Sequence, residues 1–68
     1  MYINLMTELT RQRLNIKDLS QKCGISYQTL TLKLKKPDGE GFSVKEAINI
    51  KSALDVEMSL DELFEWED

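Results

Sequence analysis

The chain has 68 residues, 41% hydrophobic and 31% charged, which indicates one small soluble domain. Its longest apolar runs are two or three residues, so we expect no membrane span, no secretory leader and a cytoplasmic location. The chain has a single cysteine, Cys23, and no histidine, so we expect neither an enzyme nor a cofactor or metal site. The net charge of −3 is uneven: nine basic and five acidic residues give +4 up to Leu54, whereas Asp55 to Asp68 holds seven acids and no base, so phosphate binding remains compatible with the basic part.

The first predicted helix covers residues 2–13. Tyr2, Leu5, Met6 and Leu9 recur at i, i+3, i+4 and i+7, the spacing that places one apolar stripe along a helix. We therefore expect this stripe to face the core.

A repeated start signal predicts four further helices, over residues 16–23, 27–36, 44–54 and 60–66. Each start has an apolar residue, a capping residue and a second apolar residue four positions after the cap, which is a hydrophobic staple. An acid three positions after the cap predicts capping boxes at Ser43 and Ser59 and a weaker one at Asn15. Pro37 is expected to end the third helix, and residues 37–41 to form a loop. With no strand pattern, the fold class is all-α with five helices.

The second and third predicted helices are joined by a short turn. Gly24 suits the left-handed residue that ends a helix, and Ile25 is expected to turn inward between the two helices. Three residues between two steeply crossing helices is the layout of a DNA-binding helix-turn-helix, here about residues 15–36. Its shared core is predicted to be Leu19, Cys23, Ile25 and Leu30, with the small Ser20 at the crossing.

The segment from Leu14 to Ser26, LNIKDLSQKCGIS, resembles the lambda-repressor-like, Cro/CI-type helix-turn-helix family in its cap, its Leu-Ser pair and its Gly-Ile-Ser turn. Residues 42–48 and 59–64 are similar to the fourth and fifth helices of small phage-associated members. The resemblance covers nearly the whole chain and implies one compact five-helix domain over residues 1–68. It departs from the family at Ile16, where many members carry glutamine, and at Lys33, where Leu34 is expected to take over the packing role.

The resemblance implies sequence-specific binding of double-stranded DNA by a small transcriptional regulator, such as a phage or prophage repressor associated with the bacterial nucleoid. Helical geometry independently predicts the DNA-reading side: opposite Leu30 and Leu34, at about 100° per residue, stand Gln28, Leu32, Lys35 and Lys36. The family places base-reading residues at positions matched by Tyr27, Gln28 and Leu32.

Side-chain chemistry assigns roles on this face. Gln28 is able to pair with adenine, Leu32 to meet a thymine methyl group, and Thr31 to do either, while Tyr27 contacts a phosphate or packs on a sugar. The predicted base-reading residues are therefore Tyr27, Gln28, Thr31 and Leu32. The predicted contacts to the DNA backbone are Lys17, Ser26, Lys35 and Lys36.

Several residues leave two interpretations open. Lys33, Lys35 and Lys36 are alternatively a solvated face, and Leu32 an isolated surface leucine or part of a dimer contact. Trp66 is either a lid on the core or the centre of a dimer patch, whereas Phe64 and Met58 are expected to close the core. Gly39 and Gly41 either let the loop approach a DNA strand or are simple turn residues.

The acidic C-terminal helix, about residues 59–67, is expected to face away from DNA and to be available as a subunit contact in a homodimer. The alternative function is a protein-interaction module that docks a basic partner through this helix, with Phe64 and Trp66. No membrane or small-molecule ligand is expected under either hypothesis.

Overall fold

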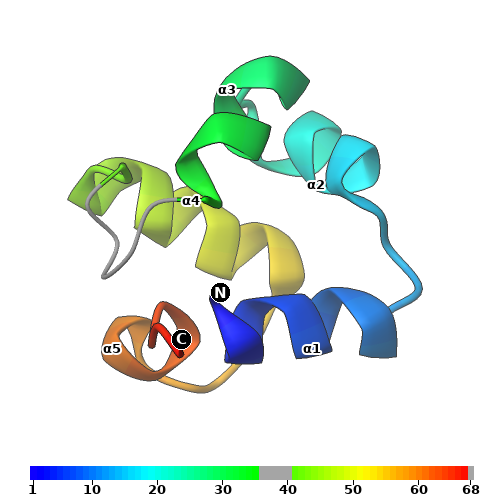
Figure 1. Ribbon diagram of the computed structural model, residues 1–68. Coiled ribbons are helices and arrows are strands. Elements are labelled where there is room, and N and C mark those ends of the chain that lie inside the picture. Colours follow the sequence, from blue (N-terminus) through cyan, green and yellow to red (C-terminus); the bar gives the residue numbers. More distant parts are fainter. Residues whose placement is uncertain (36–40, 68) are drawn as a thin grey trace.

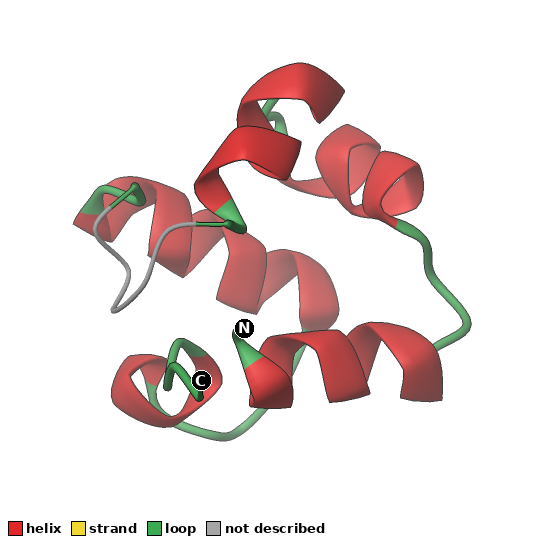
Figure 2. Ribbon diagram, in the orientation of Figure 1, coloured by secondary structure: helices red, strands yellow, loops and turns green. Residues whose placement is uncertain are grey.

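The computed structural model describes residues 1–35 and 41–67, and these residues form five helices and no strand (Figures 1 and 2). The all-α prediction is confirmed. No helix in the described ranges combines the length and apolar character needed to cross a bilayer. The helices are α1 (Ile3–Arg11), α2 (Ile16–Cys23), α3 (Tyr27–Lys33), α4 (Val44–Leu54) and α5 (Leu60–Leu63).

Side-chain caps fix where the last four helices begin. The Asn15 side chain accepts a hydrogen bond from the Asp18 amide at 2.7 Å, and the Asp18 carboxylate accepts one from the Asn15 amide at 3.0 Å. Ser43 and Glu46 form the same reciprocal pair, so the box at Asn15 is as complete as the one predicted at Ser43. At Ser59 the predicted box is only half formed, because the Glu62 carboxylate lies 3.4 Å from the Ser59 hydroxyl instead of bonding the amide. Caps of this kind contribute about 1 kcal/mol each.

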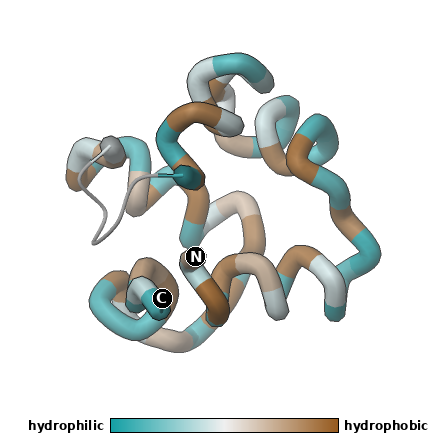
Figure 3. Tube along the Cα trace, in the orientation of Figure 1, coloured by the Kyte–Doolittle hydropathy of each residue, from teal (hydrophilic) through white to brown (hydrophobic). Residues whose placement is uncertain are grey.

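The hydrophobic core lies where the five helices meet. Helix α2 packs against α3 and α4, α4 packs against α5, and α5 packs against α1. Hydrophobic and hydrophilic positions alternate along the helices, as expected where one face of each is buried (Figure 3). The predicted apolar stripe of the first helix and the predicted core of the α2–α3 pair are both confirmed. The core side chains from the helices and the α2–α3 turn are Leu5, Leu9, Leu19, Cys23, Ile25, Leu30, Ile50, Leu54 and Leu63.

An aromatic cluster around Tyr2 closes the core where the two ends of the chain meet. The ring of Tyr2 lies edge-on to Phe42, Phe64 and Trp66, with centroid distances of 5.9, 5.8 and 5.0 Å. Tyr2 and Trp66 also form an isolated antiparallel bridge, and the Glu67 amide donates to the Met1 carbonyl at 2.9 Å. Trp66 therefore covers the core, which supports the first of the two interpretations left open by the sequence, and its outer side lines a surface hollow with Leu60.

Three predicted helix ends are wrong: those of α1 and α5, and that of α3, which ends at Lys33 instead of residue 36, before Pro37 is reached. Helix α1 ends at Arg11 instead of residue 13, because Arg13 adopts a left-handed backbone (φ 58°) that lets the Leu14 amide bond the Leu9 carbonyl at 2.8 Å. Helix α5 is one turn, Leu60–Leu63, instead of residues 60–66. The chain leaves the helix after Phe64 because Trp66 pairs with Tyr2, so the acidic C-terminal element predicted at residues 59–67 is a short helix followed by an extended segment.

The turn between α2 and α3 depends on Gly24, as predicted. Its backbone is left-handed (φ 78°, ψ 10°), and its amide donates to the Ser20 carbonyl at 3.0 Å. The next residue, Ile25, is buried against the core. This arrangement lets α3 leave α2 after a three-residue connection.

Replacing Gly24 with alanine is expected to lower the free energy of unfolding by about 1–2 kcal/mol. A Cβ at this position would meet no atom within 4 Å, so the whole loss comes from the left-handed backbone. Chemical denaturation measures the change, with Gly24→Asn as the control, because asparagine tolerates this conformation better. Equal stability of the alanine variant and the parent chain would show that the turn does not require a left-handed residue.

Candidate nucleic-acid interface

One side of α3 is held in the core and the other is exposed. Leu30 is fully buried and Leu34 is packed against the core, which confirms the packing role predicted for Leu34. On the opposite side Leu32 is 64% exposed and Gln28 is exposed, while Tyr27, which is 52% exposed, lies on a flank of the helix, about 60° around it from Leu30. Single exposed apolar side chains are ordinary on a protein surface, so the interest of Leu32 lies in its place beside Gln28 on one side of α3. The structure therefore brings two of the four predicted base-reading residues, Gln28 and Leu32, onto one open face, with Tyr27 exposed on its flank.

The hydroxyl groups of α3 are already used within the helix. Thr31 is half-buried, and its hydroxyl donates to the Tyr27 carbonyl at 2.8 Å. The Ser26 hydroxyl accepts from the Thr29 amide at 3.3 Å as the N-cap and donates to the Thr29 hydroxyl at 2.8 Å. Thr31 therefore offers its methyl group more readily than its hydroxyl, and Ser26 serves first to start the helix.

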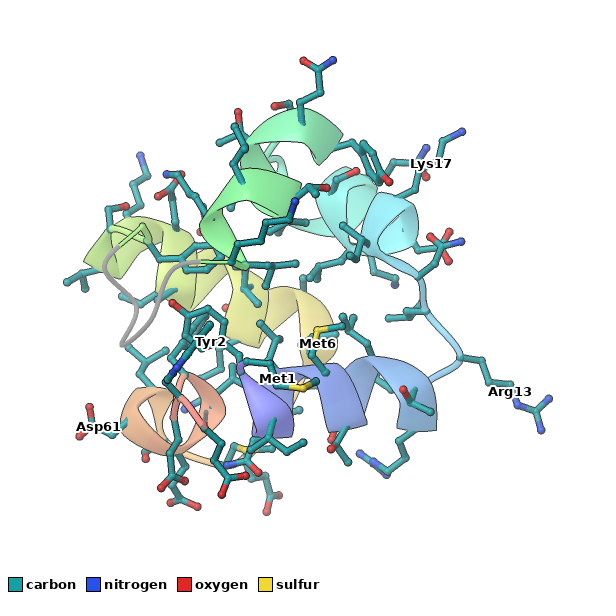
Figure 4. The ribbon with its side chains drawn as sticks, viewed as in Figure 1. Met1, Tyr2, Met6, Arg13, Lys17 and Asp61 are labelled. Carbon is teal, nitrogen blue, oxygen red and sulfur yellow. The ribbon has the colours of Figure 1, made fainter. Side chains whose placement is uncertain are left out.

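Two of the predicted phosphate contacts border this face. Lys17 on α2 and Lys35 just beyond α3 are both exposed, and neither forms an ion pair with another described residue. The side chain of Lys17 extends outward from the α2 side of the molecule (Figure 4). Helix α3 ends at Lys33 instead of residue 36, so Lys35 follows in a turn in which its amide bonds the Leu32 carbonyl at 3.2 Å. Lys36, Pro37 and Gly39 lie outside the described residues.

Lys33 belongs to the interior side of α3. Its ammonium group lies 2.5 Å from a carboxylate oxygen of Glu46, and both side chains are three-quarters buried. The same carboxylate oxygen accepts from the Ser43 amide at 3.0 Å, so one glutamate caps α4 and ties it to α3. Gly41 packs against this lysine, since a Cβ there would lie 3.2 Å from the Lys33 Cα. Of the two open interpretations of Gly41, a turn residue fits better than contact with a DNA strand, because Gly41 lies in a turn that packs against Lys33.

Two hydrogen bonds lower the pKa of Glu46 below its ordinary value of 4.5. The larger effect comes from the Lys33 ammonium group and the next from the Ser43 amide. A carboxyl group with a lower pKa in the folded state stabilises the fold above its unfolded pKa, and this contribution is lost as the pH falls through the folded pKa.

Replacing Lys33 with methionine is expected to reduce stability at pH 7 by about 1 kcal/mol or less and to flatten the loss of stability below pH 4.5. Methionine keeps the apolar stem and removes only the charge. Melting temperatures measured between pH 7 and pH 3 test this, with Lys22→Met as the control, because Lys22 is exposed and forms no ion pair with a described residue. Parallel pH profiles for the two variants would contradict the role given to Lys33.

The acidic end of the chain lies away from α3. Helix α5 sits at the end of the molecule opposite α3 (Figure 1), and Asp61 extends from it at the edge far from Lys17 (Figure 4). Phe64 and Trp66, which the alternative hypothesis offers to a protein partner, instead pack against the core. The basic face of α2 and α3 is thus separated from the negative charge that would repel a polyanion.

Two features are not marked by the helical periodicity of apolar residues. Glu8 is buried on the apolar side of α1, where its carboxylate accepts from Arg11 and, at 2.8 Å, from Gln12. Gln12 also donates to the Leu54 carbonyl at 2.8 Å, which joins the ends of α1 and α4. The hydrogen bonds from Arg11 and then Gln12 lower the pKa of Glu8.

The second feature is an exposed apolar pair on α4, Val44 and Ile48. Their i, i+4 spacing is visible in the sequence, but this spacing does not show whether the pair is buried or exposed.

No group of three or more histidine, cysteine, aspartate or glutamate side chains within residues 1–35 and 41–67 is arranged to hold a metal ion. Cys23 is a buried free thiol in the core. The chain matches no family model, no curated protein and no solved structure. The resemblance to the Cro/CI-type family therefore stays a prediction from the residues.

Proposed function

We propose that this chain is a small transcriptional regulator of the lambda-repressor-like, helix-turn-helix type, which binds double-stranded DNA in the bacterial cytoplasm and reads the major groove with α3. The observation that carries the proposal is the open side of α3, on which Gln28 and Leu32 stand exposed with Lys17 and Lys35 at its borders. Helix α2 would cross the DNA backbone.

The chemistry of this face suits a duplex. Gln28 and Leu32 are one turn apart, so both side chains project from α3 in the same direction. The Gln28 amide forms a bidentate pair with adenine, which contributes about 1–3 kcal/mol of discrimination, and Leu32 contacts a thymine methyl group. Lys17 and Lys35 neutralise phosphates and release counterions, which sets the register of the helix without reading sequence.

The alternative function, a module that docks a basic protein through its acidic end, has weaker support. Its apolar anchors, Phe64 and Trp66, are partly buried in the aromatic cluster with Tyr2, so each offers a partner only part of its ring.

Selection from a random pool of duplexes at moderate salt tests the proposal. We expect one sequence to be enriched, with an affinity that falls as salt rises, because each neutralised phosphate contributes about 0.9 to the slope of log K against log salt. Lys17→Gln and Lys35→Gln should each lower this slope by about one and weaken all sequences alike. No enrichment, together with an affinity that does not respond to salt, would refute DNA binding.

A further inference from the structure

The outer side of α1 carries two apolar hollows that join. One hollow runs along α1, and the other lies between α1 and the start of α2. Met6 and Thr10 line both hollows, so the two form one surface, here called the α1 groove. Its partly or largely exposed apolar side chains are Met1, Ile3, Met6, Leu14 and Ile16, with Tyr27 of α3 at the α2 end.

The surface of the α1 groove suits an apolar partner. Single exposed apolar residues are ordinary, but here they adjoin one another along a whole helix. Met1 and Met6 lie over the same side of α1 (Figure 4), and methionine side chains adapt to the shape of what they contact. The Thr10 hydroxyl, between the two hollows, already donates to the Met6 carbonyl at 3.1 Å.

The charged side chains that line the α1 groove are all basic. Lys17 lines it at the α2 end, is exposed and forms no ion pair with another described residue. Arg11 lines the hollow along α1 and is paired with Glu8, which is itself buried. Asp18, on the first turn of α2, accepts from the Asn15 amide and lines neither hollow. The groove therefore presents uncompensated positive charge at its α2 end.

We infer that the α1 groove binds an amphipathic helical segment of another protein, one that carries acidic residues beside its apolar stripe. A helix of this kind lays apolar residues at i, i+3, i+4 and i+7 into an apolar groove, and its carboxylates meet Lys17. A basic segment would instead place like charges together. The acidic helix of this chain itself, α5, is a single turn, Leu60–Leu63, which is too short to supply such a stripe.

The α1 groove shares residues with the proposed DNA surface. Lys17 is a proposed phosphate contact, and Tyr27 lies on the flank of the α3 face. A bound segment would cover both and would compete with a duplex. This competition rests on the proposed function, whereas the docking does not, because peptide binding is measured without DNA.

Selection from a displayed library of random peptides, each about 16 residues or four helical turns long, tests the inference with the full chain as bait. We expect the enriched peptides to be negatively charged, with apolar residues repeating every three or four positions. A synthetic copy of one of them should gain helical circular dichroism on binding. No enrichment, or enrichment of basic or uncharged peptides, would overturn the inference.

Substitutions locate the peptide on the chain by isothermal titration. Thr10→Glu places a carboxylate between the two hollows and should weaken binding about 10-fold or more, while Ser52→Glu, at an exposed position of α4 in neither hollow, should not. Lys17→Glu should also weaken binding about 10-fold, with Lys22→Glu at the exposed end of the same helix as its control. Equal affinities for the two glutamate variants of Thr10 and Ser52 would place the peptide elsewhere.

Two further measurements separate the other outcomes. Self-association of the parent chain that Thr10→Glu abolishes would assign the α1 groove to a second copy and would overturn the inference. The selected peptide should displace a bound duplex in fluorescence anisotropy. A chain that binds the peptide but no duplex would refute the proposed function and leave the docking site in place.

Discussion

Replacing Tyr2 with alanine is expected to lower the free energy of unfolding by about 3–5 kcal/mol. A domain of 68 residues has a total stability of about 3–10 kcal/mol, so the variant should be largely unfolded or close to it. Tyr2 is 1% exposed and contacts the rings of Phe42, Phe64 and Trp66. Its removal leaves a cavity at the point where α1, the start of α4 and the C-terminal segment meet.

Thermal and urea denaturation measure this effect, and the chain supplies its own control. Tyr27 is the other tyrosine, and because it is half exposed, Tyr27→Ala should change stability by about 0.5 kcal/mol or less. Tyr2→Phe keeps the three ring contacts and should retain most of the stability. Equal effects of alanine at positions 2 and 27 would show that the aromatic cluster does not hold the core closed.

Replacing Leu32 with aspartate is expected to weaken DNA binding by at least about 100-fold while the free energy of unfolding changes by about 0.5 kcal/mol or less. The Leu32 side chain is mostly exposed, so its replacement removes little packing from the core. In the proposed complex the new carboxylate would enter a groove bordered by phosphates, where like charges repel by several kcal/mol.

Fluorescence anisotropy with the selected duplex measures the loss, and Gln28→Ala provides the comparison. That variant should lose about 1–3 kcal/mol on the preferred sequence and little on duplexes altered at one base pair, because it removes a single base contact. Uniform loss for Gln28→Ala would remove Gln28 from the base-reading residues. Full affinity for Leu32→Asp would place the DNA surface elsewhere on the molecule.

Local signals were enough to predict much of the fold. The four helix starts follow from caps and staples within six residues of chain, and Gly24 marks the left-handed turn by its identity alone. The exposed side of α3 follows from the positions of Leu30 and Leu34 and the turn of about 100° per residue. The helix starts, the turn and the exposed side of α3 each depend on residues close together in sequence. Local sequence patterns therefore predict them.

The errors arise where distant residues decide. Arg13 takes a left-handed backbone without glycine, so nothing in its identity marks the end of α1. Helix α5 stops after one turn because Trp66 pairs with Tyr2, 64 positions earlier. Lys33 is partly buried because it forms an ion pair with Glu46 on another helix. The solvent exposure of Val44 depends on how α5 packs beside α4. The DNA-reading role of α3 remains a prediction, because it concerns a partner and not the fold.

The contact between the two ends of the chain has a consequence for topology. The amide of Glu67 already bonds the carbonyl of Met1, so a head-to-tail cyclic backbone closed by a short linker would join groups that the native state holds together. Cyclisation would leave the folded molecule unstrained while it restricts the unfolded ring, an entropic gain of about 4 kcal/mol for a loop of this length in the chain-entropy treatment of cross-links. The ring should melt at a higher temperature than the linear chain, and its junction would lie well away from α3 (Figure 1).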